Sequence, residues 1–134
     1  MSASVAVAFA NDAFYTAFAG RDFPLMQTVW SQRDAVSCLH PGWPPLIGRE
    51  AVMASWASIL GNESSPRIRC LHPAAFVNGE VAYVVCHEAL SEGFLIATNV
   101  FVKEGSVWKM VHHQAGSTPQ PDGSEDDGET TPLQ

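Results

Sequence analysis

The sequence predicts an α+β domain, with helices in the first half of the chain and antiparallel strands in the second. Apolar residues recur with helical spacing up to about residue 60 and alternate along the chain after residue 67. Three turn signals divide the second half into four strands: Asn78-Gly79, Glu92-Gly93 and Glu104-Gly105. Helices followed by a run of strands are typical of α+β domains, whereas α/β domains alternate the two.

Three helices are predicted in the first half. The first covers residues 4–19, where apolar side chains recur four residues apart, and it ends at Gly20. Asp22 is a favourable N-cap for the second helix, which is expected to stop near Arg33. The third helix covers residues 49–60.

The predicted sheet begins with a short strand at residues 35–40. The loop HPGWPPLIG follows at residues 40–48, because three prolines and two glycines in nine residues cannot continue a helix or a central strand. Four more strands complete the sheet: residues 67–77, 81–90, 94–103 and 107–115.

These strands are largely apolar on both faces, unlike a sheet with one solvated face. In the last strand, Trp108, Met110 and His112 alternate with residues that include Lys109 and His113. Since the helices can cover only one face, we expect a homodimer that covers the other. This alternation predicts that His112 lies on the covered face and His113 at the dimer interface.

The composition indicates one weakly charged domain with an acidic tail. The 134 residues are 46% hydrophobic and 16% charged, with a formal net charge of −7. Five of the 14 acidic residues follow residue 120, so residues 1–115 carry a net charge of only −2 and are about 53% apolar. We therefore predict a domain at residues 1–116 and a disordered acidic tail at 117–134.

Several partner classes lack support in the sequence. No nucleic acid is expected, because the strand region contains no basic patch. No membrane partner is expected, because no apolar run approaches the length of a spanning helix. The first residues lack the basic start of a signal peptide, and three cysteines are an odd number. Reduced thiols and a cytoplasmic location are therefore expected.

Neither a metal nor a cofactor is expected. Cys38-x-His40 and Cys70-x-His72 lack the close ligand pairs of ordinary zinc sites. The sequence also has no GxSxG, P-loop or GxGxxG motif, so it gives no support for a nucleophile elbow, a nucleoside triphosphate or a dinucleotide.

Several segments together resemble one known superfamily. A helix ending in Ala-Gly-Arg-Asp, a Trp on the next helix, HPGWPPLIG-x-x-x-V-x-x-SW and a final W-x-x-VHHQAG occur in this order. The chain resembles the nuclear transport factor 2-like superfamily and, within it, the small SnoaL-like, polyketide-cyclase-like proteins. The resemblance implies a cone-shaped fold, in which a curved antiparallel sheet wraps around three helices and encloses a pocket, and the convex face pairs with a second copy.

A more distant resemblance, to ketosteroid isomerases, implies candidate catalytic residues. Their general base is matched by His40, which precedes Pro41 and whose neutral ring suits a base near pH 7. Their protonated aspartic acid in the oxyanion hole is matched by Asn99, whose amide can donate to an enolate. Their helix-borne tyrosine is matched by Phe14, with Tyr15 beside it, and this departure argues against a steroid-type isomerisation.

The chain also resembles the association domain of calcium/calmodulin-dependent kinase II. The similarity lies in the segment from Cys38 to Gly42 and in the last strand, from Trp108 to Gln114. That domain oligomerises and is not an enzyme, so these segments are also explained by the shape of the fold alone.

The predicted site combines these positions. We predict His40, Asn99 and His112 as catalytic residues and the following as ligand contacts: Tyr15, Trp43, Trp56, Phe101 and Gln114. Structural alternatives remain open: a loop-anchoring histidine for His40, a buried hydrogen-bond network for Asn99, and core packing for Trp56.

The sequence thus predicts a homodimer that binds a small apolar or carbonyl-containing molecule. As an enzyme it would be an isomerase, cyclase or dehydratase, in which His40 abstracts a proton alpha to a carbonyl and Asn99 stabilises the enolate. The alternative is a non-catalytic ligand-binding or oligomerisation module. Geometry separates these hypotheses, because the enzymatic one requires His40 and Asn99 to share a cavity.

Overall fold

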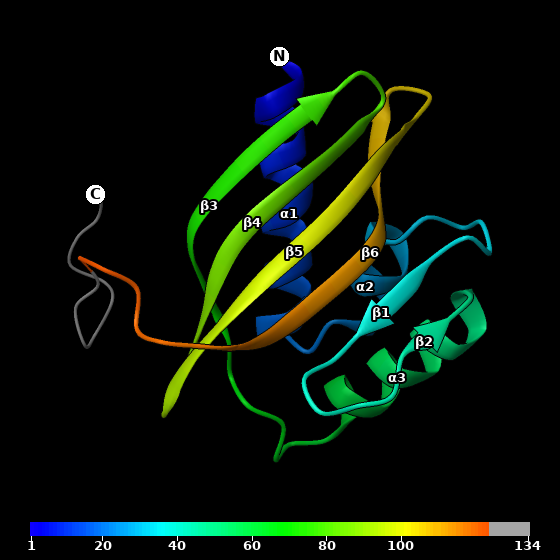
Figure 1. Cartoon of the computed structure of the whole chain (residues 1–134). Coiled ribbons are helices and arrows are strands. Elements are labelled where there is room, and N and C mark those ends of the chain that lie inside the picture. The colour runs from blue at the N-terminus through cyan, green and yellow to red at the C-terminus, as the bar shows by residue number, and fades with distance from the viewer. Residues whose placement is uncertain (124–134) are drawn as a thin grey trace.

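The computed structural model describes residues 1–123 and confirms the α+β architecture (Figure 1). Three helices, α1 (Ala3–Ala19), α2 (Phe23–Val29) and α3 (Arg49–Gly61), accompany a curved, unclosed sheet of six strands. The strands are β1 (Ser37–Leu39), β2 (Leu46–Ile47), β3 (Arg69–Asn78), β4 (Val81–Leu90), β5 (Gly93–Glu104) and β6 (Val107–Thr118). Figure 1 shows α1 passing behind the long strands, with α2 and α3 near β1.

The sheet has the order β2-β1-β6-β5-β4-β3. Strands β3 to β6 form the predicted antiparallel meander, but β1 runs parallel to β6 and pairs Cys38 with His113. The helix-rich first half thereby joins the sheet through the last strand. This pairing brings the loop that begins at His40 beside the C-terminal half of β6.

The second helix is shorter than predicted. Asp22 caps it as expected, accepting a hydrogen bond from Leu25 N at 3.0 Å. The helix ends at Val29 because Trp30 adopts an extended conformation and forms a parallel bridge with Met110. The backbone of Ser31 then donates to the carbonyl of Met110, so this segment belongs to the sheet edge and no longer to a helix.

A β-bulge interrupts the alternation of β6. Val100 pairs with His112, but the next residue of β5, Phe101, pairs with Met110, so Val111 is an extra residue in β6. Met110 and His113 are therefore both buried, and His112 is only partly buried. The predicted faces of the two histidines were wrong, because the alternation was extended through a position where the strand slips by one residue.

Both faces of the sheet carry apolar side chains, as the sequence pattern predicts, but the helices cover only one of them. Inward-facing side chains of β4 and β5 are buried in the core with the helices, and Phe101 is fully buried. The outer face of β3 and β4 exposes apolar side chains, among which Phe76 and Tyr83 stack with ring centroids 4.9 Å apart. This outer face is the surface that the dimer prediction concerns.

The chain beyond the domain is only partly described. Strand β6 extends to Thr118, two residues past the predicted domain end at 116. Residues 124–134 of the predicted tail lie outside the described residues. Within residues 1–123, no helix is long and apolar enough to cross a membrane.

Candidate functional site

A cavity of about 320 Å³ opens between the loop after β1, the loop before β3 and the ends of β4, β5 and β6. Most of its wall is apolar. Its buried polar wall consists of three titratable side chains, His40, Glu88 and His113. A largely apolar cavity with a few convergent polar groups is typical of small-molecule sites.

A larger hollow, of about 430 Å³, lies between α1, α2 and the start of β6. It is more open, and the ammonium of Lys109 on its wall already donates to the carbonyl of Thr28. It has no buried titratable group, so the smaller cavity is the better candidate for chemistry.

Glu88 lies at the centre of the polar wall. It is 1% exposed, because it continues the inward alternation of Ala82, Val84 and Cys86 along β4. The hydroxyl of Tyr15, on α1, donates to Glu88 Oε2 at 2.5 Å. Burial raises the pKa of the Glu88 carboxyl to about 7, and the hydrogen bond from Tyr15 opposes this rise. The carboxyl can therefore both give and accept a proton near neutral pH.

His113 lies beside Glu88, with its Nε2 3.9 Å from Glu88 Oε2. The distance would suit a loose ion pair, but the electrostatics argue against one. Burial, followed by the neighbouring rings of His40 and His112, lowers the pKa of His113 to about 3. A neutral imidazole thus faces a carboxyl that is half protonated near pH 7, and their contact is not ionic.

Asn99 stands behind His113 and does not line the cavity. It is fully buried and uses both ends of its amide: Oδ1 lies 2.6 Å from His113 Nδ1, and Nδ2 donates to Asn11 Oδ1 at 2.8 Å and to the hydroxyl of Tyr15 at 3.1 Å. The predicted sharing of one cavity by Asn99 and His40 is therefore wrong, and the enzymatic hypothesis fails in the form that depends on these two residues. Asn99 belongs to a hydrogen-bond network that holds His113 and Tyr15.

His40 does line the cavity. Its Nε2 lies 2.9 Å from Ser55 Oγ on α3, and its ring makes edge contacts with Trp43 and Trp56 at centroid distances of 4.9 and 4.8 Å. Burial lowers the pKa of His40 to about 4, so the ring is neutral at pH 7. The residue combines the two predicted possibilities, since it anchors its loop and also faces the cavity.

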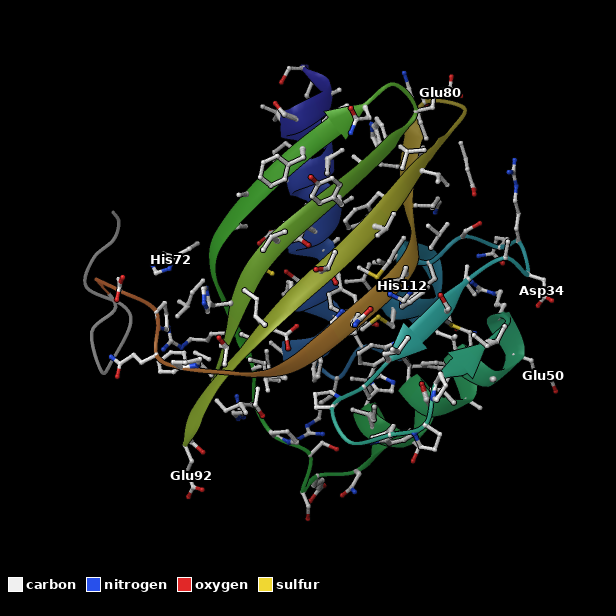
Figure 2. The ribbon with its side chains drawn as sticks, viewed as in Figure 1. Asp34, Glu50, His72, Glu80, Glu92 and His112 are labelled. Atoms are coloured by element: carbon white, nitrogen blue, oxygen red, sulfur yellow. The ribbon has the colours of Figure 1, made fainter. Side chains whose placement is uncertain are left out.

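The other predicted residues separate into three groups. Trp43 lines the cavity and is 44% exposed, so it covers the mouth. Tyr15, Trp56 and Phe101 are buried and do not line the cavity; Tyr15 and Trp56 contact lining residues from behind, whereas Phe101 belongs to the core. The third group lies near β1. Figure 2 shows His112 beside β1 and β6, where its ring forms hydrogen bonds with Ser37 Oγ at 2.7 Å and Gln114 Oε1 at 3.1 Å. His112 and the exposed Gln114 are therefore outside the cavity.

The sequence analysis missed Glu88 and misplaced His113. The alternation of β4 was a sufficient signal for Glu88, because an acidic residue two positions after Cys86 on an inward face is unusual. No comparable signal existed for His113, since the bulge depends on the pairing of β5 with β6. Among residues 1–123, no group of three or more His, Cys, Asp or Glu side chains is placed to hold a metal ion.

Comparison with known proteins identifies the family of this chain. The profile of the SnoaL-like domain matches residues 7–120, nearly the whole of the described chain. The chain belongs to the SnoaL-like domain family. No curated protein sequence matches it.

Two solved structures are similar to this SnoaL-like domain at above 30% identity. One, from Thiobacillus denitrificans, carries a provisional assignment as a calcium/calmodulin-dependent protein kinase type II association domain; it is 34% identical, with 81% of this chain and 92% of that chain covered and a TM-score of 0.71. The other, from Streptomyces avermitilis, is provisionally assigned as a dehydratase of the NTF2-like family. It is 32% identical, with 87% of this chain and 96% of that chain covered and a TM-score of 0.78.

A third solved structure, the CaMKII hub of S. rosetta, is similar at 20% identity. It has a TM-score of 0.72, with 88% of this chain and 98% of that chain covered. At this identity the similarity supports the fold alone.

Proposed function

We propose that this SnoaL-like domain binds a small, largely apolar molecule in the cavity beside Glu88 and performs acid–base chemistry on it without a metal or cofactor. The isomerase, cyclase and dehydratase classes all require this chemistry. The observation that carries the proposal is the buried carboxyl of Glu88, whose pKa of about 7 suits proton transfer at neutral pH. The provisional dehydratase among its relatives adds support for the third class.

The roles follow from the contacts of the three polar side chains. In a dehydration, the carboxylate of Glu88 accepts the proton from the carbon next to a carbonyl, and the carboxyl so formed gives that proton to the departing hydroxyl, which leaves as water. The carbon–oxygen bond breaks as the double bond forms. Glu88 ends as the carboxylate with which it began, and His113, whose Nε2 lies 3.9 Å away, stays neutral throughout.

This assignment replaces the predicted pair of His40 and Asn99. His40 remains at the cavity as a neutral ring, while Asn99 positions His113 through the 2.6 Å contact with Nδ1. Trp43 and the apolar wall would exclude water from the bound molecule.

The experiment uses the aldol adduct of benzaldehyde and acetone, a β-hydroxy ketone. Deuterium uptake next to the carbonyl reports proton abstraction, and the absorbance of benzylideneacetone reports dehydration. We expect the wild type to exceed the buffer rate and Glu88→Gln to lose roughly a hundredfold or more. Glu80→Gln, an exposed carboxylate in the β3–β4 turn (Figure 2), is the matched control. A wild type no faster than buffer, or a Glu88→Gln variant as fast as wild type, would refute the catalytic role.

A second candidate function is oligomerisation, favoured by the exposed apolar face of β3 and β4. We propose that a homodimer forms through this face, on which Phe76 and Tyr83 are 44% and 37% exposed. The similarity to a provisional association domain supports the idea. The two functions are compatible, because the cavity opens elsewhere on the fold.

The three free cysteines are consistent with the proposed cytoplasmic location.

A further inference from the structure

His113 presents a lone pair, not a proton, to the cavity. Both amide protons of Asn99 are used, on Asn11 Oδ1 and on the hydroxyl of Tyr15, so the amide nitrogen points away from His113. The oxygen Oδ1 that faces the ring can only accept, and it lies 2.6 Å from Nδ1. The proton of the neutral ring is therefore on Nδ1. Its Nε2 accepts no hydrogen bond from any of residues 1–123.

His40 has the opposite tautomer. The hydroxyl of Ser55 has one proton, which it donates to the carbonyl of Val52 at 2.7 Å. In the 2.9 Å contact between Ser55 and His40, the donor must then be the Nε2–H of His40. Its Nδ1 is left with a lone pair, and the thiol of Cys38, 3.8 Å away, is a weak partner for it.

Glu88 contributes acceptors as well. The proton of the Tyr15 hydroxyl is directed at Oε2 at 2.5 Å, and Oε1 has no partner of its own among the described residues. Once ionised, the carboxylate is an acceptor at both oxygens. The carboxylate of Glu88 and Nε2 of His113 then form a part of the buried wall that offers only acceptors.

The rest of the cavity wall supplies few hydrogen-bond donors. The residues that line the cavity include no lysine and no arginine, and most are apolar. Trp43 and Ser65 carry donors; Trp43 is 44% exposed, and Ser65 is partly buried. The buried indole N–H of Trp56 has no partner within residues 1–123, yet Trp56 is not among the lining residues.

We propose, resting on the proposed ligand cavity, that it selects a neutral hydroxyl compound with an apolar body, whose O–H donates to the wall formed by His113 Nε2 and Glu88. A carbonyl or ether oxygen can only accept hydrogen bonds. A molecule with no other polar group would therefore form no hydrogen bond with His113 Nε2 or Glu88 and would leave these buried acceptors without a donor. A carboxylate or phosphate would also lack a cation to pair with. This choice narrows the predicted class of apolar or carbonyl-containing ligands to those that carry a hydroxyl.

The test compares three ligands that share one ring system: β-naphthol, its methyl ether and β-methylnaphthalene. The ether keeps the oxygen of naphthol but not its proton, and the hydrocarbon has neither. Their affinities for the full chain are measured by titration calorimetry near pH 8, where Glu88 is mostly ionised. We expect β-naphthol to bind roughly tenfold or more tightly than the ether, and the ether no more tightly than the hydrocarbon.

A variant then tests the source of the selectivity. Glu88→Gln places an amide that can donate in the wall, so the preference for naphthol over the ether should fall several-fold. Glu80→Gln, on the exposed turn, should keep the wild-type preference. The wild-type comparison does not depend on how well Glu88→Gln folds.

The outcomes separate this inference from the proposed function. If all three ligands bind with equal affinity, or the ether binds more tightly, the cavity binds ligands but the hydroxyl selection is wrong. If none of the three binds, the ligand cavity itself is refuted, and the hydroxyl selection with it. A preference for naphthol that is as large in Glu88→Gln as in the wild type would also overturn the assignment of the wall.

Discussion

Nδ1 of His113 lies 2.6 Å from Oδ1 of Asn99, between the neighbouring strands β6 and β5. The two residues are directly paired in the β5–β6 register, and both are buried. The contact sets the orientation of the imidazole relative to Glu88. It also connects the cavity wall to Tyr15 and Asn11 on α1, through the other end of the Asn99 amide. Glu88 and His113 are thus held by strands and a helix, which hold geometry better than loops do.

The two neighbouring histidines of β6 should respond differently to truncation. His113→Ala removes a fully packed ring and leaves Asn99 Oδ1 without its donor, so we expect a loss of about 2–4 kcal/mol in the free energy of unfolding. His112→Ala removes a partly exposed ring and should cost less than about 1 kcal/mol. Urea denaturation measures both. Equal losses, or a larger loss for His112, would show that the bulge is misplaced.

Asn99 should be intolerant of an apolar replacement of similar size. Asn99→Leu leaves His113 Nδ1–H, Asn11 Oδ1 and the Tyr15 hydroxyl each without one partner. We expect destabilisation by about 2–4 kcal/mol, because several buried groups lose hydrogen bonds at once. Gln114→Ala on the exposed side of β6 is the control, with a change within about 1 kcal/mol. A neutral effect of Asn99→Leu in thermal denaturation would mean that the network contributes little.

The sequence was most informative where structure depends on local pattern. The Asn78-Gly79 turn, the cap at Asp22 and the alternation of Ala82, Val84 and Cys86 all have direct physical causes in neighbouring residues. The same alternation, followed two residues further, would have placed Glu88 in the interior.

The rest depended on contacts between distant segments. The parallel pairing of β1 with β6 joins Cys38 to His113, 75 residues later, and no local pattern encodes it. The bulge at Val111 forms because β5 and β6 change register, and it reverses the face of every later residue in β6. For this reason the sequence predicted His112 as a site residue, whereas in the structure His113 lines the cavity.

Glu88 should make the stability of the protein depend on pH in a defined direction. Its pKa is about 7 in the folded state and 4.5 in the unfolded chain, so between these values the folded state binds more protons. The contribution of Glu88 to the free energy of unfolding should therefore fall as pH rises from about 4.5 to about 7 and then level off.

The variant Glu88→Gln isolates this contribution. The opposite contributions of His40 and His113 are present in both proteins and cancel in the difference. The unfolding free energy of wild type minus that of Glu88→Gln should fall by about 3 kcal/mol across the window. Urea titrations at several pH values measure it, with Glu80→Gln as the control that shows no such trend. A flat difference would indicate an ordinary carboxyl at position 88.

The outer face of the sheet should set the oligomeric state. Tyr83→Lys introduces a charge beside Phe76 at the centre of the exposed apolar patch. We expect wild type to scatter light with twice the 14.4 kDa mass of one chain at micromolar concentration, and the variant to scatter as a single chain. Thr28→Lys, on α2 away from this face, should remain dimeric. A wild-type mass near 14.4 kDa would refute the dimer.

The central claim is that a titrating carboxyl at Glu88 forms the wall of a ligand cavity, and carbon-13 NMR of the glutamate side-chain carboxyls tests it most directly. The resonance that is missing from the spectrum of Glu88→Gln identifies Glu88 in the wild type. We expect this resonance to titrate with a midpoint of about 7 and to shift when β-naphthol is added. A midpoint near 4.5 and no response to the ligand would contradict the account.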